Sequence, residues 1–213
     1  MSAGKPMPWW QKVLAGFAWI VLILLLVSSD FMDQSLVRER NYVQRDLGES
    51  SCQYVYDEAA DWYKTLFVDS GIYTTLHRTL IPNEEEKQHS RGMETMGNAW
   101  FKWIEGRLDA SMRVIYMFLT RCVQLLLWIP FIPLVFLPAF YDGLMVRKIK
   151  RTNFDYSSPA LHSYAVRSSW TVAFLLFLGF FAPIAIAPIV FPIVIFICGS
   201  LMGLSVANIQ KRV

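Results

Sequence analysis

Residues 168–210 read SSWTVAFLLFLGFFAPIAIAPIVFPIVIFICGSLMGLSVANIQ and contain no Asp, Glu, Lys or Arg. This uncharged stretch is longer than the ~20 apolar residues that one helix needs to cross a hydrocarbon core of about 30 Å. Pro183 and Pro188 interrupt it near its middle, where proline removes a backbone donor and collides with the preceding helical turn. We therefore expect two membrane-spanning helices here, with one long, tilted or re-entrant segment as the alternative.

A second uncharged run lies near the N-terminus, at residues 13–29. It is somewhat short for a crossing, but Trp9, Trp10 and Lys12 are suited to anchor it at the membrane interface. A secretory signal peptide is the competing interpretation, and residues 27–30 lack the small-residue cleavage pattern that it needs. We expect a first membrane-spanning helix.

The third uncharged run covers residues 122–141 and predicts another crossing. The expected fold class is thus an all-α membrane protein with four transmembrane helices and a helical periplasmic insert between the first and second. The predicted parts are the N-terminal tail with the first span (1–29), the insert (30–112), the second span (113–141), a basic segment (142–167) and a hairpin with the C-terminal tail (168–213).

Charge is distributed unevenly between the insert and the rest of the chain. Residues 30–112 hold nine basic and fifteen acidic residues, a net charge of −6, whereas the remainder holds eleven basic and two acidic residues, a net charge of +9. Basic residues next to membrane spans favour the cytoplasmic side. We therefore expect both termini and residues 142–167 in the cytoplasm and the insert outside it.

The insert has the pattern of a small helical domain. Residues 39–47 and 54–68 lack Gly and Pro, and the second stretch carries one wide apolar stripe. Ser50 or Ser51 is expected to cap this second helix, Gly71 to end it, and residues 72–80 to form a third element.

Tryptophans mark the stretch that leads from the insert into the second span. Gly92 and Gly97 are expected to interrupt the chain, after which a long helix carries Trp100 and Trp103 toward the membrane. These two side chains are suited either to contact a partner subunit or to anchor at the membrane interface.

No catalytic constellation is present in the sequence. The three histidines are His77, His89 and His162, and the expected topology separates the third from the other two. Zinc and nucleotide motifs are missing, so we expect no enzymatic activity, no metal and no cofactor. Cys122 and Cys198 fall in apolar runs, which leaves Cys52 either inert or in an intermolecular contact.

Ionisable residues inside spans would indicate an ion or proton pathway. The candidates are Arg121 and Asp142, at opposite ends of the second span. We interpret both as boundary residues, with Arg121 reaching toward the outer surface. A small transporter or channel remains an alternative function.

A basic block follows the second span, and its candidate contact residues are Asp142, Gly143, Arg147, Lys148, Lys150 and Arg151. We expect Gly143 to allow a turn where the helix ends. The block is suited to contact the lipid bilayer or an acidic partner protein, and it is too short to indicate direct contact with nucleic acid.

Two small residues on the last predicted helix, Gly199 and Gly203, are spaced four apart, as a close helix contact requires. Packing within the chain and homo-oligomer formation explain this spacing equally well.

Several segments together resemble a known family: PAFYDGL at residues 138–144, the basic residues from 147 to 151, and SSP at 157–159 followed by His162 and Tyr164. With the apolar start, the helical insert and the terminal hairpin, this layout resembles the integral membrane proteins of the domain of unknown function 4400 family. Those proteins occur in conjugative plasmids and integrating conjugative elements of Gram-negative bacteria.

The resemblance implies a non-enzymatic inner-membrane component of conjugative DNA transfer, beside the coupling ATPase or another component of the type IV secretion channel. It implies that Asp142, Gly143 and Arg147 are the residues most involved. An exclusion or immunity factor that acts through the outer-facing insert is a further alternative.

Overall fold

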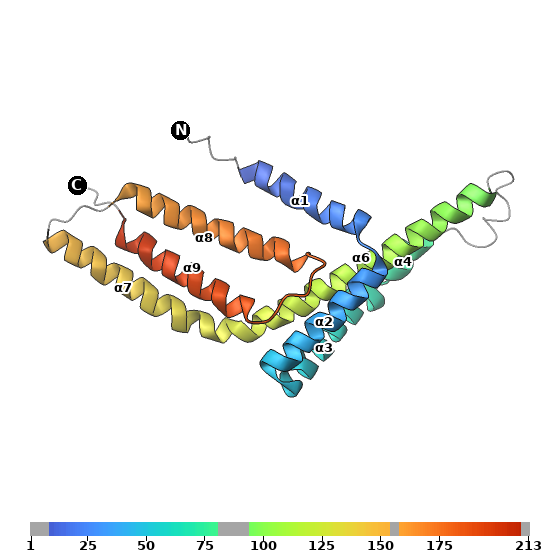
Figure 1. The fold of residues 1–213 in the computed structure, drawn as a ribbon, viewed down its shortest axis with the longest axis horizontal. Coiled ribbons are helices and arrows are strands. Elements are labelled where there is room, and N and C mark those ends of the chain that lie inside the picture. Colours follow the sequence, from blue (N-terminus) through green and yellow to red (C-terminus); the bar gives the residue numbers. More distant parts are fainter. Residues whose placement is uncertain (1–8, 81–93, 154–157, 210–213) are drawn as a thin grey trace. The chain divides into compact units, whose positions relative to one another are not determined.

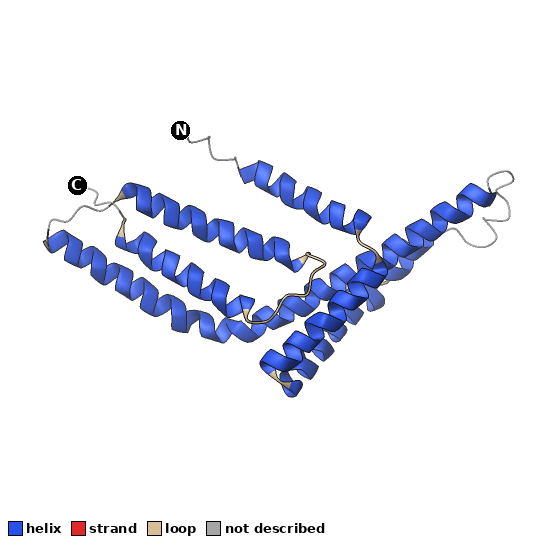
Figure 2. Ribbon diagram, viewed as in Figure 1, coloured by secondary structure: helices blue, strands red, loops and turns tan. Residues whose placement is uncertain are grey.

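The computed structural model describes residues 9–80, 94–153 and 158–209. Within these ranges the chain is helical and contains no strand (Figure 1, Figure 2). It forms two compact units. The first comprises Met1–Arg121 with Phe180–Ala185, and the second comprises Cys122–Gly179 with Ile186–Val213.

The first unit contains the insert. Its elements are α1 (Trp9–Leu26), α2 (Ser29–Leu47), α3 (Glu49–Tyr63), the π-helix η1 (Lys64–Asp69), α4 (Ile72–Leu80) and the first part of α6 (Glu94–Trp128).

Helices α2 and α3 pack against each other because each has a buried stripe at helical spacing. On α2 the stripe comprises Met32, Ser35, Glu39 and Val43, and on α3 it comprises Cys52, Val55 and Ala59. Met32 also packs with Val114 and Met117 of α6 in the core of the unit. Cys52 is only 2 % exposed, and of the two alternatives left open for this thiol its burial favours the inert one.

The chain reverses between α2 and α3 at Gly48, whose φ of 85° is costly for residues that carry a Cβ. The first residue outside α3 is this glycine, and it makes no side-chain cap. Our expected cap at Ser50 or Ser51 is therefore wrong, because both residues already lie inside the helix.

Two further expectations concern glycines. Gly71, at φ 73°, follows η1 and precedes α4 at Ile72–Leu80, so the expected helix end and third element are confirmed. Gly97 lies inside α6, and the expected interruption there is wrong because a helix tolerates one glycine at a cost of about 1 kcal/mol. Gly92 lies outside the described residues.

The second unit contains the end of α6 and three apolar helices. Its elements after α6 are the 3₁₀ turn η2 (Ile129–Phe131), α7 (Ile132–Thr152), most of α8 (Pro159–Phe180) and α9 (Val190–Ala207). Helices α7 and α9 run side by side (Figure 1).

Three helices, not the four expected, are long and apolar enough to cross a membrane among the described residues. They are the helical run Trp103–Thr152, Pro159–Phe180 and Val190–Ala207. The described side chains of α1 form a shorter apolar helix, Val13–Leu22. The three apolar helices are compatible with a membrane location.

The proline break in the last uncharged run is confirmed. Helix α8 ends at Phe180 and α9 begins at Val190, so residues 168–210 form two helices rather than one. In contrast, the boundary at 142 is no helix end, because α7 continues through the basic block to Thr152.

Candidate functional site: a buried ion pair and a basic groove

The first unit buries an ion pair between α2 and α6. The Arg121 Nη2 atom donates to Glu39 Oε2 at 2.7 Å and Nε donates to Oε1 at 3.0 Å, so the contact is bidentate. The exposed fractions of the two side chains are 0 % and 1 %. Arg121 therefore does not reach toward a surface as expected, since its charge is neutralised inside the protein.

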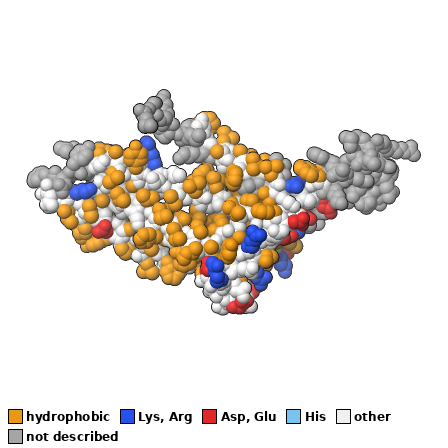
Figure 3. All heavy atoms as spheres, viewed as in Figure 1, with side chains coloured by type: hydrophobic (Ala, Val, Ile, Leu, Met, Phe, Trp, Pro, Cys, Tyr) orange, Lys and Arg blue, Asp and Glu red, His pale blue; other side chains and the backbone are white. Residues whose placement is uncertain are grey.

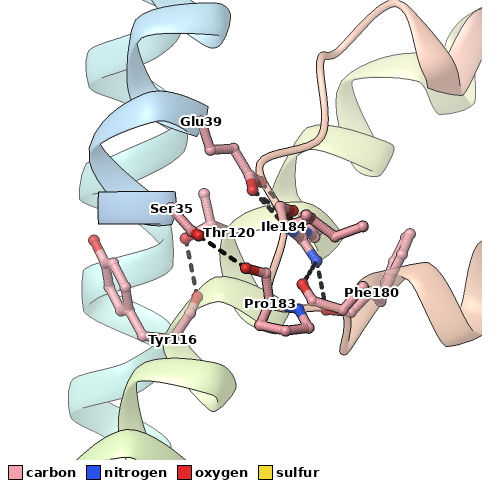
Figure 4. Close-up of polar contacts among 9 residues, drawn as sticks. Ser35, Glu39, Tyr116, Thr120, Phe180, Pro183 and Ile184 are labelled. Atoms are coloured by element: carbon pink, nitrogen blue, oxygen red, sulfur yellow. Dashed lines mark hydrogen bonds and ion pairs between the residues drawn. The ribbon is translucent and has the colours of Figure 1, made fainter. Parts of the chain in front are cut away.

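The same guanidinium holds the chain that follows α8. Arg121 donates to the carbonyl oxygens of Phe180 at 3.1 Å, Ala182 at 2.8 Å and Ile184 at 2.6 Å. Ser35 of α2 donates to the carbonyl oxygen of Pro183 at 2.8 Å (Figure 4).

These contacts have a physical reason in the proline-rich break. The last carbonyls of a helix have no partner within it, and Pro183 prevents the next turn from supplying donors. Buried backbone oxygens must still be hydrogen-bonded, because each unpaired group costs free energy. Arg121 supplies five donors on one planar group, which is enough for a carboxylate and several carbonyls together.

Glu39 is not among the site residues predicted from the sequence, although the sequence carries a signal for it. Glu39 and Ser35 occupy the same helical stripe as Met32 and Val43, which marks their side chains as facing the core of the unit. A carboxylate at such a position needs a cationic partner, and Arg121 is the uncompensated charge next to a long apolar run.

The ion pair also changes the electrostatics around Tyr56 of α3. Burial raises the pKa of the Tyr56 phenol above its ordinary value, and the negative charge of Glu39 raises it further. The phenol therefore stays protonated near neutral pH.

The described part of the chain holds no group of three or more His, Cys, Asp or Glu side chains placed to bind an ion. His162 lies in α8 with its Nδ1 atom 2.9 Å from the carbonyl oxygen of Ser205. His89 and the acidic triplet 84–86 lie outside the described residues.

The second unit brings the glycines of the sequence analysis together. A Cβ atom at Gly143 of α7 would lie 2.5 Å from the carbonyl oxygen of Gly203, and one at Gly203 would lie 2.7 Å from that of Ala139. A Cβ at Gly199 would lie 2.8 Å from Val135 Cγ1. The turn expected at Gly143 is therefore absent, and its lack of a side chain instead lets α7 and α9 approach closely.

The basic residues occupy the last two turns of α7. Lys150 donates to Asn208 Oδ1 after the end of α9, at 2.9 Å. Lys148 and Arg151 are exposed, whereas Arg147 is half-buried. Of Lys148, Lys150 and Arg151, Lys150 contacts the C-terminal end of α9 through Asn208, whereas the other two are exposed.

The tryptophans lie on α6, within the first unit. Trp103 is 43 % exposed, and the Arg107 guanidinium lies over its ring at 5.7 Å from the centroid. Trp100 lies in the same helix, and its side chain is outside the described residues.

These features define the class of protein: a helical protein whose apolar helices are compatible with a membrane location. Among the described residues it has one fully buried ion pair, Glu39 with Arg121, and Arg121 also binds the segment between α8 and α9. A family described as IncC plasmid conjugative DNA transfer protein DtrJ-like matches residues 26–212. The chain belongs to this DtrJ-like family.

The match supports the conjugation-related family that the sequence motifs imply, while the label of domain of unknown function 4400 stays a prediction. The matched residues begin at the end of α1 and include all three candidate membrane helices. Comparisons with curated proteins and with solved structures give no match.

Proposed function

We propose that this chain is a non-enzymatic inner-membrane component of a conjugative DNA-transfer system, and that it acts as a scaffold for, or partner of, the coupling ATPase of a type IV secretion channel. The observation that carries this proposal is the family match over residues 26–212, because that family is described as a conjugative DNA transfer protein.

Three crossings suffice for the path that we propose from the insert to the C-terminus, whereas the cytoplasmic N-terminus predicted from the sequence would need α1 to cross as well. From an insert in the periplasm, the run through α6 and α7 brings the basic end of α7 to the cytoplasm, α8 returns to the periplasm, and α9 brings the C-terminus back. The positive-inside rule supports this direction, since the insert is acidic and the end of α7 is basic.

A scaffold role agrees with the chemistry of the described residues. The buried carboxylate of Glu39 is occupied by Arg121, which suits structural coupling rather than proton transfer. In contrast, Lys148 and Arg151 are exposed at the end of α7, where a cytoplasmic acidic partner would find them.

The test is a pull-down of the tagged full-length chain from crosslinked donor membranes, followed by identification of the co-purified proteins. We expect the coupling ATPase in the eluate. The double charge reversal Lys148→Glu and Arg151→Glu should lower its recovery severalfold, because the electrostatic complementarity changes sign. The matched control is Lys64→Glu with Arg78→Glu, which changes the charge equally at exposed positions of the insert.

Two outcomes would overturn the proposal. One is a chain isolated without any conjugation protein, and the other is an equal loss of recovery in both double variants. Mating assays distinguish this proposal from the alternative of an exclusion factor. Under the proposal, deletion of the gene in the donor should reduce transfer. Unchanged transfer from such a donor, together with raised DNA uptake by a recipient that lacks the gene, would favour exclusion.

A further inference from the structure

A groove lies beside the close contact of α7 and α9, entirely within the second unit. Its volume is about 450 Å³, within the size range of small-molecule sites. Its walls come from three helices, and the lining residues are Ala139, Asp142, Val146 and Lys150 of α7, Leu161 of α8, and Ser200, Gly203, Leu204, Ala207 and Asn208 at α9 and just after it.

A positioned cation lines the groove. The Lys150 ammonium donates to Asn208 Oδ1 at 2.9 Å, and Asn208 Nδ2 in turn donates to the carbonyl oxygen of Leu204 at 2.9 Å. The amide is thereby oriented, and it holds the lysine side chain at the groove. An ammonium has three N–H donors, and among the described residues the contact with Asn208 uses one of them.

The helices around the groove have the surface of a lipid-facing protein. Trp170 of α8 is 73 % exposed, Leu134 of α7 is 68 % exposed and Phe196 of α9 is 65 % exposed. Hydrophobic side chains dominate the face over these helices (Figure 3). Exposed apolar area of this extent marks contact with a membrane or a partner, and the length and composition of these helices favour the membrane.

Charge selects the kind of lipid. Arg147, Lys148 and Arg151 lie in the same two turns of α7 as Lys150 and give this end a strong positive potential. The one acidic residue on the wall, Asp142, lies eight residues earlier, which is about 12 Å along the helix axis. Its carboxylate repels a phosphate and confines it to the Lys150 end.

We infer that this groove binds one anionic phospholipid, with its phosphate on the Lys150 ammonium and an acyl chain against Val146, Leu161 and Leu204. This is a defined site with one occupant, in addition to the diffuse attraction of exposed basic residues to a membrane surface. It does not depend on the role in DNA transfer.

The test is native mass spectrometry of the full-length chain in detergent, titrated with phosphatidylglycerol and, in parallel, with phosphatidylethanolamine. We expect one tightly retained phosphatidylglycerol per chain. Lys150→Gln should weaken it roughly fivefold, the ratio that corresponds to about 1 kcal/mol per basic residue at an anionic lipid. Asp142→Asn should strengthen binding, because the repulsion of the phosphate is removed.

Matched controls are Lys148→Gln and Arg151→Gln, which remove the same charge from exposed positions that do not line the groove. Each should change the affinity less than twofold, because solvent and salt screen an exposed charge that does not touch the bound phosphate. Ser200→Leu keeps every charge and fills the groove, so it should also release the lipid. Unchanged helical content by circular dichroism should accompany each variant.

The inference fails if phosphatidylethanolamine is retained as well as phosphatidylglycerol, or if the three lysine and arginine variants lose lipid equally. Displacement of the lipid by millimolar inorganic phosphate would show a phosphate site instead. A second copy of the chain in place of the lipid would show a protein interface.

Discussion

At the residue scale, the pair of Glu39 and Arg121 is the feature with the largest energetic consequence. Removing both charges from water costs several kcal/mol per ion, and only close hydrogen bonds compensate for it. Arg121 meets this condition through the carboxylate and three carbonyl oxygens, so its loss would leave a buried charge and three acceptors without a donor.

We predict that Arg121→Met lowers the free energy of unfolding by about 3–5 kcal/mol, because Glu39 is left charged and buried. The double variant Glu39→Gln with Arg121→Met should lose less than the sum of the two single losses, since no unpaired charge remains. The measurement is denaturant unfolding in micelles, followed by circular dichroism. Strict additivity would contradict the coupling.

A second ion pair joins the same two helices outside the core, and it serves as the matched control. Arg113 of α6 pairs with Asp33 of α2 at 2.8 Å, with side chains that are 35 % and 52 % exposed. Asp33→Asn should cost less than about 1 kcal/mol, because exposed ion pairs are screened by solvent.

At the element scale, the contact of α7 with α9 depends on missing side chains. Gly143 and Gly203 bring two backbones together, and within a membrane such close approach replaces the hydrophobic effect as the source of helix association. The prolines have the complementary role, because Pro183 and Pro188 separate α8 from α9 and force the connection to find donors elsewhere.

We predict that Gly143→Ala lowers the free energy of unfolding by about 1–3 kcal/mol, since its methyl group would lie 2.5 Å from a backbone oxygen that must move. Gly106→Ala in α6 is the matched control, because a Cβ there meets no atom within 4 Å. It should stabilise the chain by about 0.5–1 kcal/mol through helix propensity. Equal effects in unfolding assays would show that helix propensity, not the α7–α9 contact, governs both positions.

At the scale of the whole molecule, membrane topology follows from where the charges lie. In the proposed topology, the acidic insert and the basic end of α7 are on opposite sides of the membrane, and the run of α6 and α7 connects them.

We predict that Ser50→Cys, in a background without the native cysteines, reacts with a membrane-impermeant maleimide in intact cells. Arg151→Cys should react only after the inner membrane is opened, because the proposed topology puts the basic end of α7 in the cytoplasm. Both positions are exposed, so accessibility within the protein does not distinguish them. The reverse labelling pattern would contradict the proposed topology and show that the insert faces the cytoplasm.

The sequence by itself determined the helical class, the apolar stretches, the proline break after Phe180 and the short helix after Gly71. These properties are local, since they depend on hydrophobicity along the chain and on the backbone limits of proline and glycine. The same local signals predicted four spans, whereas three helices among the described residues are long and apolar enough to cross a membrane.

Only the tertiary structure decided which residues meet across long separations. Glu39 and Arg121 are 82 positions apart, and Gly143 and Gly203 are 60 positions apart. Whether a charge is a boundary residue or a buried partner depends on the helix that packs against it, and whether a glycine ends a helix or joins two depends on its neighbour in space.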